Sequence, residues 1–387
     1  MICRVCKTET EQFLDLGRQP IANAFIQSKL SDEFFYNLEV FFCPHCFTVQ
    51  IGDCPDKERV FNDDYAFFTS TSNRMIEHFK KLADEIKRDF LGKDGFIVEI
   101  GSNDGTFLKN FKGYKHLGIE PSSSVNFSAQ KKGLRTWNDF FNQGIAEAIV
   151  ERKGQADVIV TTNCFPHMVD RHSVLQGIKR LLKTTGIWIN EEAYLKRIMM
   201  MGSYDQFYNE HVFYSSVRSF NKSMYFFKLK LFDVKPQEVH GGSMRYYTGH
   251  EGAWMPSSKR IDYHRKEEGL DHISVFVDFA DKVQRSRKAL KFYLNNLKDE
   301  EVVGYGATAK STTILNYCDI GTSLISRIYD NTPIKQGKLS PGKHIPIVPY
   351  YEFERDKPKH VVLFAWNHAE EIMDKEKGRD IHWISPI

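Results

Sequence analysis

The chain has 387 residues, of which 41% are hydrophobic and 27% are charged, a composition that excludes a largely disordered protein. That length exceeds the usual size of one hydrophobic core and predicts two or three domains. The formal net charge of +3 gives no electrostatic case for nucleic-acid binding. Since the sequence shows neither a membrane-length apolar run nor a secretory signal, we expect a cytoplasmic protein.

The first 60 residues are predicted to form a small, irregular unit of short strands that is too small to be held together by burial alone. It carries two C-x-x-C pairs, Cys3 with Cys6 and Cys43 with Cys46, separated by 36 residues. One such pair alone fits a redox pair or chance, but two pairs favour a closed four-sulfur zinc site with a structural role. Cys54 and His45 are alternatives for one ligand, although neither has the spacing of the pairs.

The middle of the chain alternates helical and strand patterns. Apolar residues at helical spacing predict an amphipathic helix over 72–90, and the following apolar runs predict parallel strands at 95–100, 116–119, 156–161 and 186–190. This alternation is typical of a doubly wound α/β sheet.

A third segment begins after a long amphipathic stretch at 274–297. Strand patterns recur at 301–305, 326–329 and 360–364, and the first of them runs into glycines at 304 and 306. The helix expected next, together with Lys310, offers amides and a cation to a phosphate. The segment shows neither a Walker motif nor a complete dinucleotide fingerprint, so we expect no bound NAD. The alternative is a Rossmann-like half that is kept for packing.

The first strand of the middle segment ends in an acidic glycine turn at 99–105 and is expected to lead into a helix at 107–111. A glycine turn alone fits any doubly wound domain. Glu120, which ends the next predicted strand, adds a carboxylate where the ribose hydroxyls of a nucleoside ligand would lie. The pattern resembles class I methyltransferases and thereby implies S-adenosylmethionine (SAM) as the cofactor. The residues predicted to bind it are Glu99, Gly101, Asn103, Asp104, Gly105, Glu120 and Asn163.

Two further segments, 162–167 and 204–214, concentrate protonatable side chains near predicted strand ends, where doubly wound folds place ligands. Methyl transfer to carbon needs a base that removes a proton next to a carbonyl, and a histidine suits that task. Tyr208 and His211 share a face if this short run is helical. Alternatively, His167 only caps a turn and the neighbouring aromatic residues belong to the core.

Several motifs carry a resemblance over nearly the whole chain: the first C-x-x-C pair, 13–17 (FLDLG), 20–25 (PIANAF), 208–211 (YNEH), 240–243 (HGGS), 304–307 (GYGA) and 329–331 (YDN). With these motifs the chain resembles the zinc-containing sugar C-methyltransferases. The resemblance implies an α/β protein with a zinc-binding module at 1–60, a class I methyltransferase domain at 61–249 and a C-terminal Rossmann-like domain at 250–387. It also implies that these parts enclose a nucleotide-linked 4-keto sugar, which is methylated at C3.

The resemblance also implies roles for individual residues. His211 is the expected base, Tyr208, Glu210 and His167 surround the sugar, and Tyr65 lies near the reacting groups. Predicted contacts to the substrate come from Tyr305, Lys310, Asn331 and Lys338, whereas Ser243 and Arg245 either contact sugar or phosphate or form a tight strand turn. The chain departs from the family pattern at Asn209, where a second histidine is common, and after Glu192, where proline often follows.

Two other functions fit parts of this pattern. In the first, the enzyme transfers the methyl group to oxygen or nitrogen of a sugar instead of carbon. In the second, the zinc module serves as a nucleic-acid or protein adaptor on a methyltransferase scaffold. The near-neutral charge argues against the adaptor. The sequence leaves open whether the nucleotide is dTDP or GDP, whether C3 carries an amino or a hydroxyl group, the stereochemistry, the final product and the oligomeric state.

Overall fold

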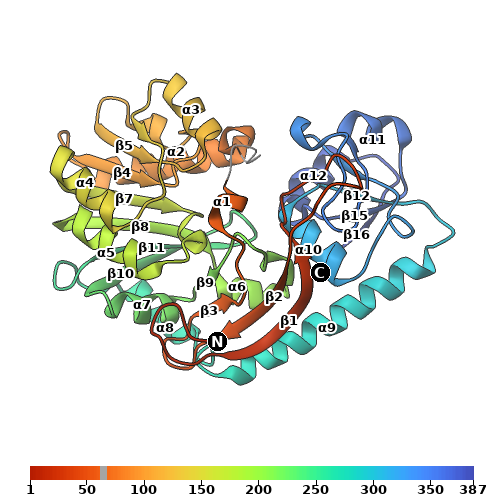
Figure 1. The fold of residues 1–387 in the computed structure, drawn as a ribbon, viewed down its shortest axis with the longest axis horizontal. Helices are drawn as coiled ribbons and strands as arrows, with labels where there is room; N and C mark the ends of the chain where they lie inside the picture. Colours follow the sequence, from red (N-terminus) through yellow and green to blue (C-terminus); the bar gives the residue numbers. More distant parts are fainter. Residues whose placement is uncertain (62–67) are drawn as a thin grey trace.

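The computed structural model describes residues 1–61 and 68–387 and shows three parts packed together (Figure 1). The N-terminal module lies between two larger α/β domains, and the long helix α9 (Ile273–Asn296) runs beneath it to the C-terminal domain. No helix in the described parts of the chain is long and apolar enough to cross a membrane.

The N-terminal module is an antiparallel sheet in the order β1-β2-β3-β9. Its elements are β1 (Glu11–Pro20), β2 (Phe35–Phe42), β3 (Val49–Ile51), β9 (Phe213–Tyr214) and the short helix α1 (Lys57–Val60). β1 and β2 have ten and eight residues, so the expectation of short strands was wrong. The physical reason is that their apolar face packs on α9, where the ring of Phe276 lies 5.0 Å from Phe13 and 4.7 Å from Phe42.

The middle domain is a seven-stranded sheet in the order β10-β11-β8-β7-β4-β5-β6. β4 (Phe96–Ile100), β5 (Lys115–Ile119), β6 (Thr136–Trp137), β7 (Ala156–Thr162) and β8 (Leu182–Ala193) are parallel, and β11 (Ser243–His250) and β10 (Leu229–Gln237) continue the sheet antiparallel. The four strands predicted in this part are confirmed. β4 has β5 on one side and β7 on the other, so a crevice opens at the carboxyl ends of these strands.

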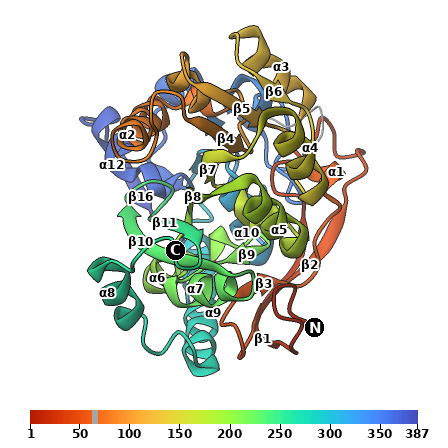
Figure 2. The same ribbon diagram turned by 90° about the vertical axis from the view of Figure 1, so that its left-hand side faces the viewer.

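Helices cover both faces of this sheet (Figure 2). The amphipathic helix predicted at 72–90 is α2 (Asn73–Asp89), which begins at the N-cap Ser72 and packs on one face. The opposite face is covered by α4 (Gln143–Lys153), α5 (Arg171–Leu181) and α7 (Val217–Tyr225). The helix expected at 107–111 is only a 3-10 turn, η2 (Leu108–Phe111), because Phe107 and Phe111 turn inward under α2. The remaining elements here are α3 (Ser123–Lys131), α6 (Leu195–Met201), α8 (Ser258–Lys266), η1 (Thr69–Thr71), η3 (Phe165–His167) and η4 (Tyr204–Gln206).

The C-terminal domain is a five-stranded parallel sheet in the order β14-β13-β12-β15-β16. Its strands are β12 (Val302–Tyr305), β13 (Ile328–Asp330), β14 (Ile347–Pro349), β15 (His360–Leu363) and β16 (His382–Ile384), which confirms the three predicted strands. The helices are α10 (Ala309–Tyr317), α11 (Tyr350–Asp356) and α12 (Ala369–Lys375), with 3-10 turns η5 (Pro333–Lys335) and η6 (Trp366–His368). Side chains of the zinc module, α9 and this domain form one continuous core, so the module is not an independent unit.

Candidate active site

The four cysteines of the two C-x-x-C pairs come together in the N-terminal module. Their sulfur atoms all lie within 4.8 Å of one another, and Cys3 Sγ is 3.6 Å from Cys46 Sγ while Cys6 Sγ is 3.4 Å from Cys43 Sγ. A tetrahedral site with Zn–S bonds of about 2.3 Å needs sulfurs about 3.8 Å apart, so the four residues fit zinc. Cys54 is not in this cluster, because its Sγ accepts a hydrogen bond from Arg4 Nη2 at 3.4 Å. The closed four-sulfur shell leaves zinc a structural role.

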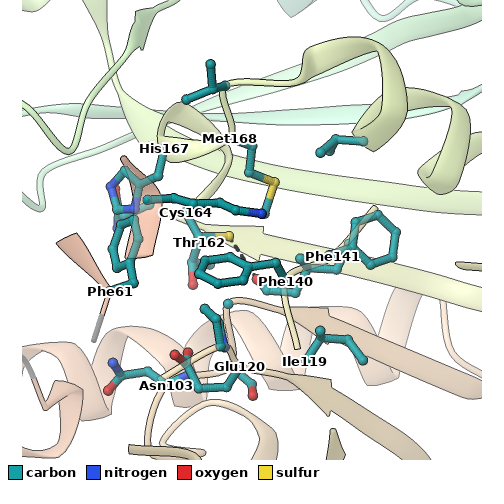
Figure 3. A pocket seen from close by; sticks show the side chains of 18 of the residues that line it. Phe61, Asn103, Ile119, Glu120, Phe140, Phe141, Thr162, Cys164, His167 and Met168 are labelled. Atoms are coloured by element: carbon teal, nitrogen blue, oxygen red, sulfur yellow. Dashed lines mark hydrogen bonds between the residues drawn. The ribbon is translucent and has the colours of Figure 1, made fainter. Parts of the chain in front are cut away.

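A cavity of about 1030 Å³ opens at the carboxyl ends of β4, β5 and β7 (Figure 3). The glycine turn after β4 forms part of its wall. Gly101 has a φ of +72°, and a Cβ there would lie 2.6 Å from Cys164 Cβ, so only glycine fits. The backbone of this turn can therefore approach a ligand closely.

Two buried carboxyl groups face this cavity. Glu120 accepts hydrogen bonds from Asn103 N and Ser122 N, both at 2.9 Å, and burial raises its pKa. Burial, followed by the charges of Glu120 and Asp104, holds the pKa of Glu99 well above its usual range. In the described parts of the chain, Glu99 Oε2 has no hydrogen-bond partner. A ligand that carries positive charge would relieve this concentration of acidic groups.

The residues predicted to bind SAM divide into two groups. Glu99, Gly101, Asn103, Glu120 and Asn163 line the cavity. Asp104 and Gly105 are outside the described lining and shape the turn: Asp104 accepts hydrogen bonds from Thr106 Oγ1 at 2.6 Å and Lys132 Nζ at 3.1 Å, and Gly105 packs against Leu134.

Among the described residues, four aromatic rings form a stack beside the cavity, in the order Phe61, His167, His211 and Tyr208, with the last ring tilted. The ring centroids of successive members are 5.3, 5.2 and 4.5 Å apart, with interplanar angles of 21°, 25° and 32°. Phe61 and His167 line the cavity, and Figure 3 shows their two rings face to face. The stack therefore connects the cavity wall to the segment 204–214, which is predicted to be catalytic.

The imidazoles in this stack are neutral. Burial, with a further contribution from Arg171, lowers the pKa of His167 to about 3. Burial, followed by the neighbouring His167, holds the pKa of His211 well below its usual range. Among residues 1–61 and 68–387, neither His167 Nε2 nor His211 Nδ1 has a hydrogen-bond partner. A neutral imidazole is the form that accepts a proton.

Tyr208 and His211 lie on a turn instead of a helix, with His211 N donating to Tyr208 O at 3.1 Å. The turn still brings Tyr208 Oη within 3.1 Å of His211 Nε2. Burial, then the charge of Glu210, holds the pKa of Tyr208 well above its usual range, so the phenol keeps its proton. Tyr65 lies outside the described residues.

The same turn is fixed to the N-terminal module and the C-terminal domain. Ala22 N donates to Asn209 Oδ1 at 2.8 Å, and Thr312 Oγ1 on α10 donates to Ala22 O at 2.8 Å. Asn23 Nδ2 donates to Glu210 Oε1 at 2.5 Å. Asn209, which stands where a histidine is common in the family pattern, thus contacts Ala22, and Ala22 in turn contacts the C-terminal domain.

The predicted substrate residues lie in different environments. Lys310 is in the first turn of α10. Burial lowers its pKa, although the charge of Asp205 acts in the opposite direction. The charge of Lys310 in turn helps to lower the pKa of His211. Asn331 is exposed and Lys338 is partly exposed. Tyr305 and Ser243 donate within the protein, to Glu376 Oε1 at 3.3 Å and Val239 O at 3.1 Å.

Arg245 is buried and bound by two carboxylates, Glu191 at 2.8 Å and Glu85 at 3.3 Å. His78 Nε2 also contacts Glu191, at 2.6 Å. The structure thus places Arg245 in a buried charge network between strands β8 and β11 and helix α2.

Sequence reasoning missed several residues of the site. Phe61 and Arg171 line the cavity, and His240, quoted only as part of a motif, lines it as well. The Arg171 guanidinium lies over the rings of Phe165 and Phe213, 3.5 and 4.0 Å from their centroids. An arginine or phenylalanine without a motif around it carries no local signal that separates these contacts from ordinary surface or core positions.

Comparison with known protein families gives matches along most of the chain. Residues 3–61 match the family described as "Putative zinc binding domain", residues 73–225 match "Methyltransferase domain", and residues 238–387 match "C-methyltransferase C-terminal domain". The C-methyltransferase NovU of Streptomyces niveus is 29% identical over 388 aligned positions, which cover 97% of this chain and 92% of that protein.

Solved structures of SAM-dependent methyltransferases resemble part of the chain. One from Clostridium acetobutylicum has 14% identity and a TM-score of 0.36, and covers 46% of this chain and 92% of its own. Another, from Anabaena variabilis, has 15% identity and a TM-score of 0.35, and covers 44% of this chain and 84% of its own.

Proposed function

We propose that this chain, a SAM-dependent C-methyltransferase with a zinc-binding module, methylates C3 of a nucleotide-linked 4-keto deoxysugar, with dTDP or GDP as the nucleotide. The observation that carries the proposal is the stack in which neutral His167 and His211 and protonated Tyr208 stand beside the donor cavity. Deprotonation of a carbon next to a ketone needs this combination of a neutral base and a hydrogen-bond donor.

The donor end of the cavity fits SAM. Gly101 lets the methionine part approach the backbone, Glu120 faces the position of the ribose, and Asn103 and Asn163 complete the wall. The acidic Glu99 and Glu120 suit a cofactor that carries a sulfonium and an ammonium group. When bound, SAM supplies an electrophilic methyl group.

His211 is the proposed base. With Nε2–H donating to Tyr208 Oη at 3.1 Å, the phenol fixes the ring and its own proton stays available, and Nδ1, which has no partner within the described residues, is the atom that takes the proton. Because burial keeps the imidazole neutral, it can take the C3 proton of the sugar. Removal of that proton leaves an electron pair shared between C3 and the 4-keto oxygen, and C3 becomes the nucleophile that a methyl donor requires.

Tyr208 and His167 are proposed to stabilise the negative charge that develops on the 4-keto oxygen. The Tyr208 phenol keeps its proton at neutral pH, so it can donate to this oxygen. His167 lines the cavity with an Nε2 atom that lacks a partner within the described residues. Glu210, held by Asn23, is placed to fix the orientation of a sugar hydroxyl.

The nucleotide diphosphate is proposed to lie against the C-terminal domain. Lys310 at the start of α10 is one proposed contact, and its charge lowers the pKa of both Asp205 and His211. Asn331 and Lys338 follow on the same domain. Arg245, Tyr305 and Ser243 are engaged within the protein and are proposed to support the site instead of contacting the substrate directly.

Replacement of His211 by Asn tests this function. With dTDP- and GDP-linked 4-keto-6-deoxy sugars, we expect both the exchange of the C3 hydrogen with solvent deuterium and methyl transfer to fall by about 10²- to 10⁴-fold, because the base is lost. Carbon NMR of the product should show a methyl group on carbon.

A His272→Asn variant is the matched control, because this histidine side chain is 76% exposed. It should keep wild-type rates. Unchanged rates in the His211 variant would reject His211 as the base, and a methyl group on oxygen or nitrogen would reject C-methylation of the sugar.

A further inference from the structure

The stack contains a residue, Phe61, that the proposed reaction does not use. Phe61 covers the face of His167 opposite His211, so that His167 lies between two rings, 5.3 and 5.2 Å from their centroids. Among these rings, Phe61 alone comes from the region that matches the zinc-binding family (residues 3–61), and Figure 3 shows its ring directly below that of His167.

We propose that Phe61 is a positioning residue for the methyl transfer: its ring closes the outer face of His167 and keeps the His167–His211–Tyr208 stack in register and free of water. This inference rests on the catalytic role proposed for His211. It assigns the zinc module a part in the active site, namely the delivery of this ring.

The path from the zinc site to Phe61 is short and fixed by hydrogen bonds. Arg4, inside the first C-x-x-C pair, donates to Ile51 O at 2.7 Å and to Gly52 O at 2.6 Å. It thereby holds the segment that leads into α1. Phe61 follows α1 directly, and its backbone N–H donates to Lys57 O at 2.8 Å.

Helix α1 is also held from the other side. Lys57 Nζ lies 4.2 Å from the centroid of Phe140 on the cavity wall, and Val60 is buried. A helix of only four residues has little stability of its own, so these contacts and the zinc knuckle determine where Phe61 lies.

The expected effect on His167 has a definite direction. A phenyl ring on an imidazole has two opposing effects: it attracts the protonated form, and it removes water that would solvate that form. Burial is the largest cause of the lowered pKa of His167, followed by the charge of Arg171. Exclusion of water therefore dominates, and removal of the ring should make His167 easier to protonate.

Histidine titration by NMR in the protein without ligands tests this inference. In Phe61→Ala we expect the pKa of His167 to rise from about 3 toward the ordinary value of 6.5. Phe61→Tyr keeps a ring on the imidazole and should restore the wild-type titration, and Phe61→Leu covers the face without a ring and should lie between. His167→Gln identifies the signal. Phe292→Ala on α9, whose side chain is 70% exposed, should leave the titration unchanged.

The pH profile of methyl transfer gives the second readout. In Phe61→Ala we expect the acidic limb of kcat/KM to move up with the pKa of His167; if this pKa reaches its ordinary value of 6.5, about a quarter of His167 stays neutral at pH 6, so activity there falls up to about fourfold and recovers near pH 8.5. An unchanged His167 titration in both Phe61→Ala and Phe61→Leu would overturn the inference. Because the titration needs no substrate, it decides the role of Phe61 even if the proposed sugar is not methylated, and absence of turnover in the wild type would reject the proposed function alone.

Discussion

The middle and C-terminal domains contain the same local motif, but its surroundings differ between them. In each, a parallel strand runs into a glycine turn, and an acidic residue at the end of the next strand holds that turn. Glu120 accepts from Asn103 N and Ser122 N, and Asp330 accepts from Ala307 N at 2.8 Å and Thr332 N at 2.7 Å. The acidic residue therefore serves the turn in both domains.

The two domains differ in what covers the turn. In the middle domain the turn and Glu120 face the large cavity. In the C-terminal domain Ala365 packs over Gly306, and Lys335 Nζ donates to Ala307 O at 2.8 Å and lies 4.0 Å from Asp330. The comparison teaches that the strand, turn and acidic residue stabilise a loop, whereas a ligand site also requires space that the chain leaves open.

The largest expected effect in this comparison is on SAM affinity, when the glycine of each turn is replaced by alanine. In Gly101→Ala the Cβ meets Cys164 at the wall of the cavity, so we expect SAM affinity to fall by roughly 100-fold or more. Gly306→Ala, with a φ of +90° and a Cβ 2.8 Å from that of Ala365, should lower stability but leave SAM affinity unchanged. Calorimetric titration with SAM compares the two variants, and equal affinities would remove the distinction between the turns.

Ligand-induced thermal stabilisation sharpens the comparison by ligand class. S-adenosylhomocysteine at about 100 times its Kd should stabilise the protein by about 2.7 kcal/mol and raise its Tm, because it binds the folded state alone. NAD should leave the Tm unchanged, since the C-terminal turn is filled by the chain. A rise with NAD that Gly306→Ala abolishes would show that this turn does bind a dinucleotide.

The smallest expected effect concerns Glu99, which lies two residues before Gly101. The corresponding position in the C-terminal domain, two residues before Gly306, is Gly304. The pKa of Glu99 is raised in the folded protein above its ordinary value of 4.5, so the folded state holds this proton more tightly than the unfolded state. Stability therefore falls as the pH rises above 4.5, and Glu99→Gln should be more stable than the wild type at pH 7 by about 1 kcal/mol.

The same variant should bind SAM about tenfold more weakly, because the carboxylate lines the cavity. Urea unfolding between pH 4 and pH 8 and calorimetric titration measure the two effects, with the exposed Glu300→Gln as the control. A stability difference that does not grow with pH would contradict the assignment of Glu99 as a buried carboxylate that disfavours folding.

The parts that could be predicted from sequence have a local signature. Buried parallel strands are short apolar runs, zinc ligands show a fixed spacing, and Glu120 follows a strand directly. Tyr208 and His211 lie side by side as expected, although the expected helix is a turn, because both geometries bring residues three apart together.

The parts that escaped prediction depend on contacts between distant segments. The length of β1 follows from packing on α9, and the position of Phe61 follows from the zinc module folding over the middle domain. The filling of the C-terminal turn depends on Ala365, which comes from a loop far along the chain from Gly306. Local patterns carry no information about such partners.

The hydrogen bonds around Ala22 have a consequence for how substrate reaches the site. Ala22 binds Asn209 on the catalytic turn through its N–H and Thr312 on the C-terminal domain through its carbonyl. A hinge motion that opened the two large domains would have to break these bonds and expose the core that the module shares with both α9 and the C-terminal domain. We therefore expect the enzyme to be preorganised, with association rates set by diffusion into the cavity and not by a slow domain opening.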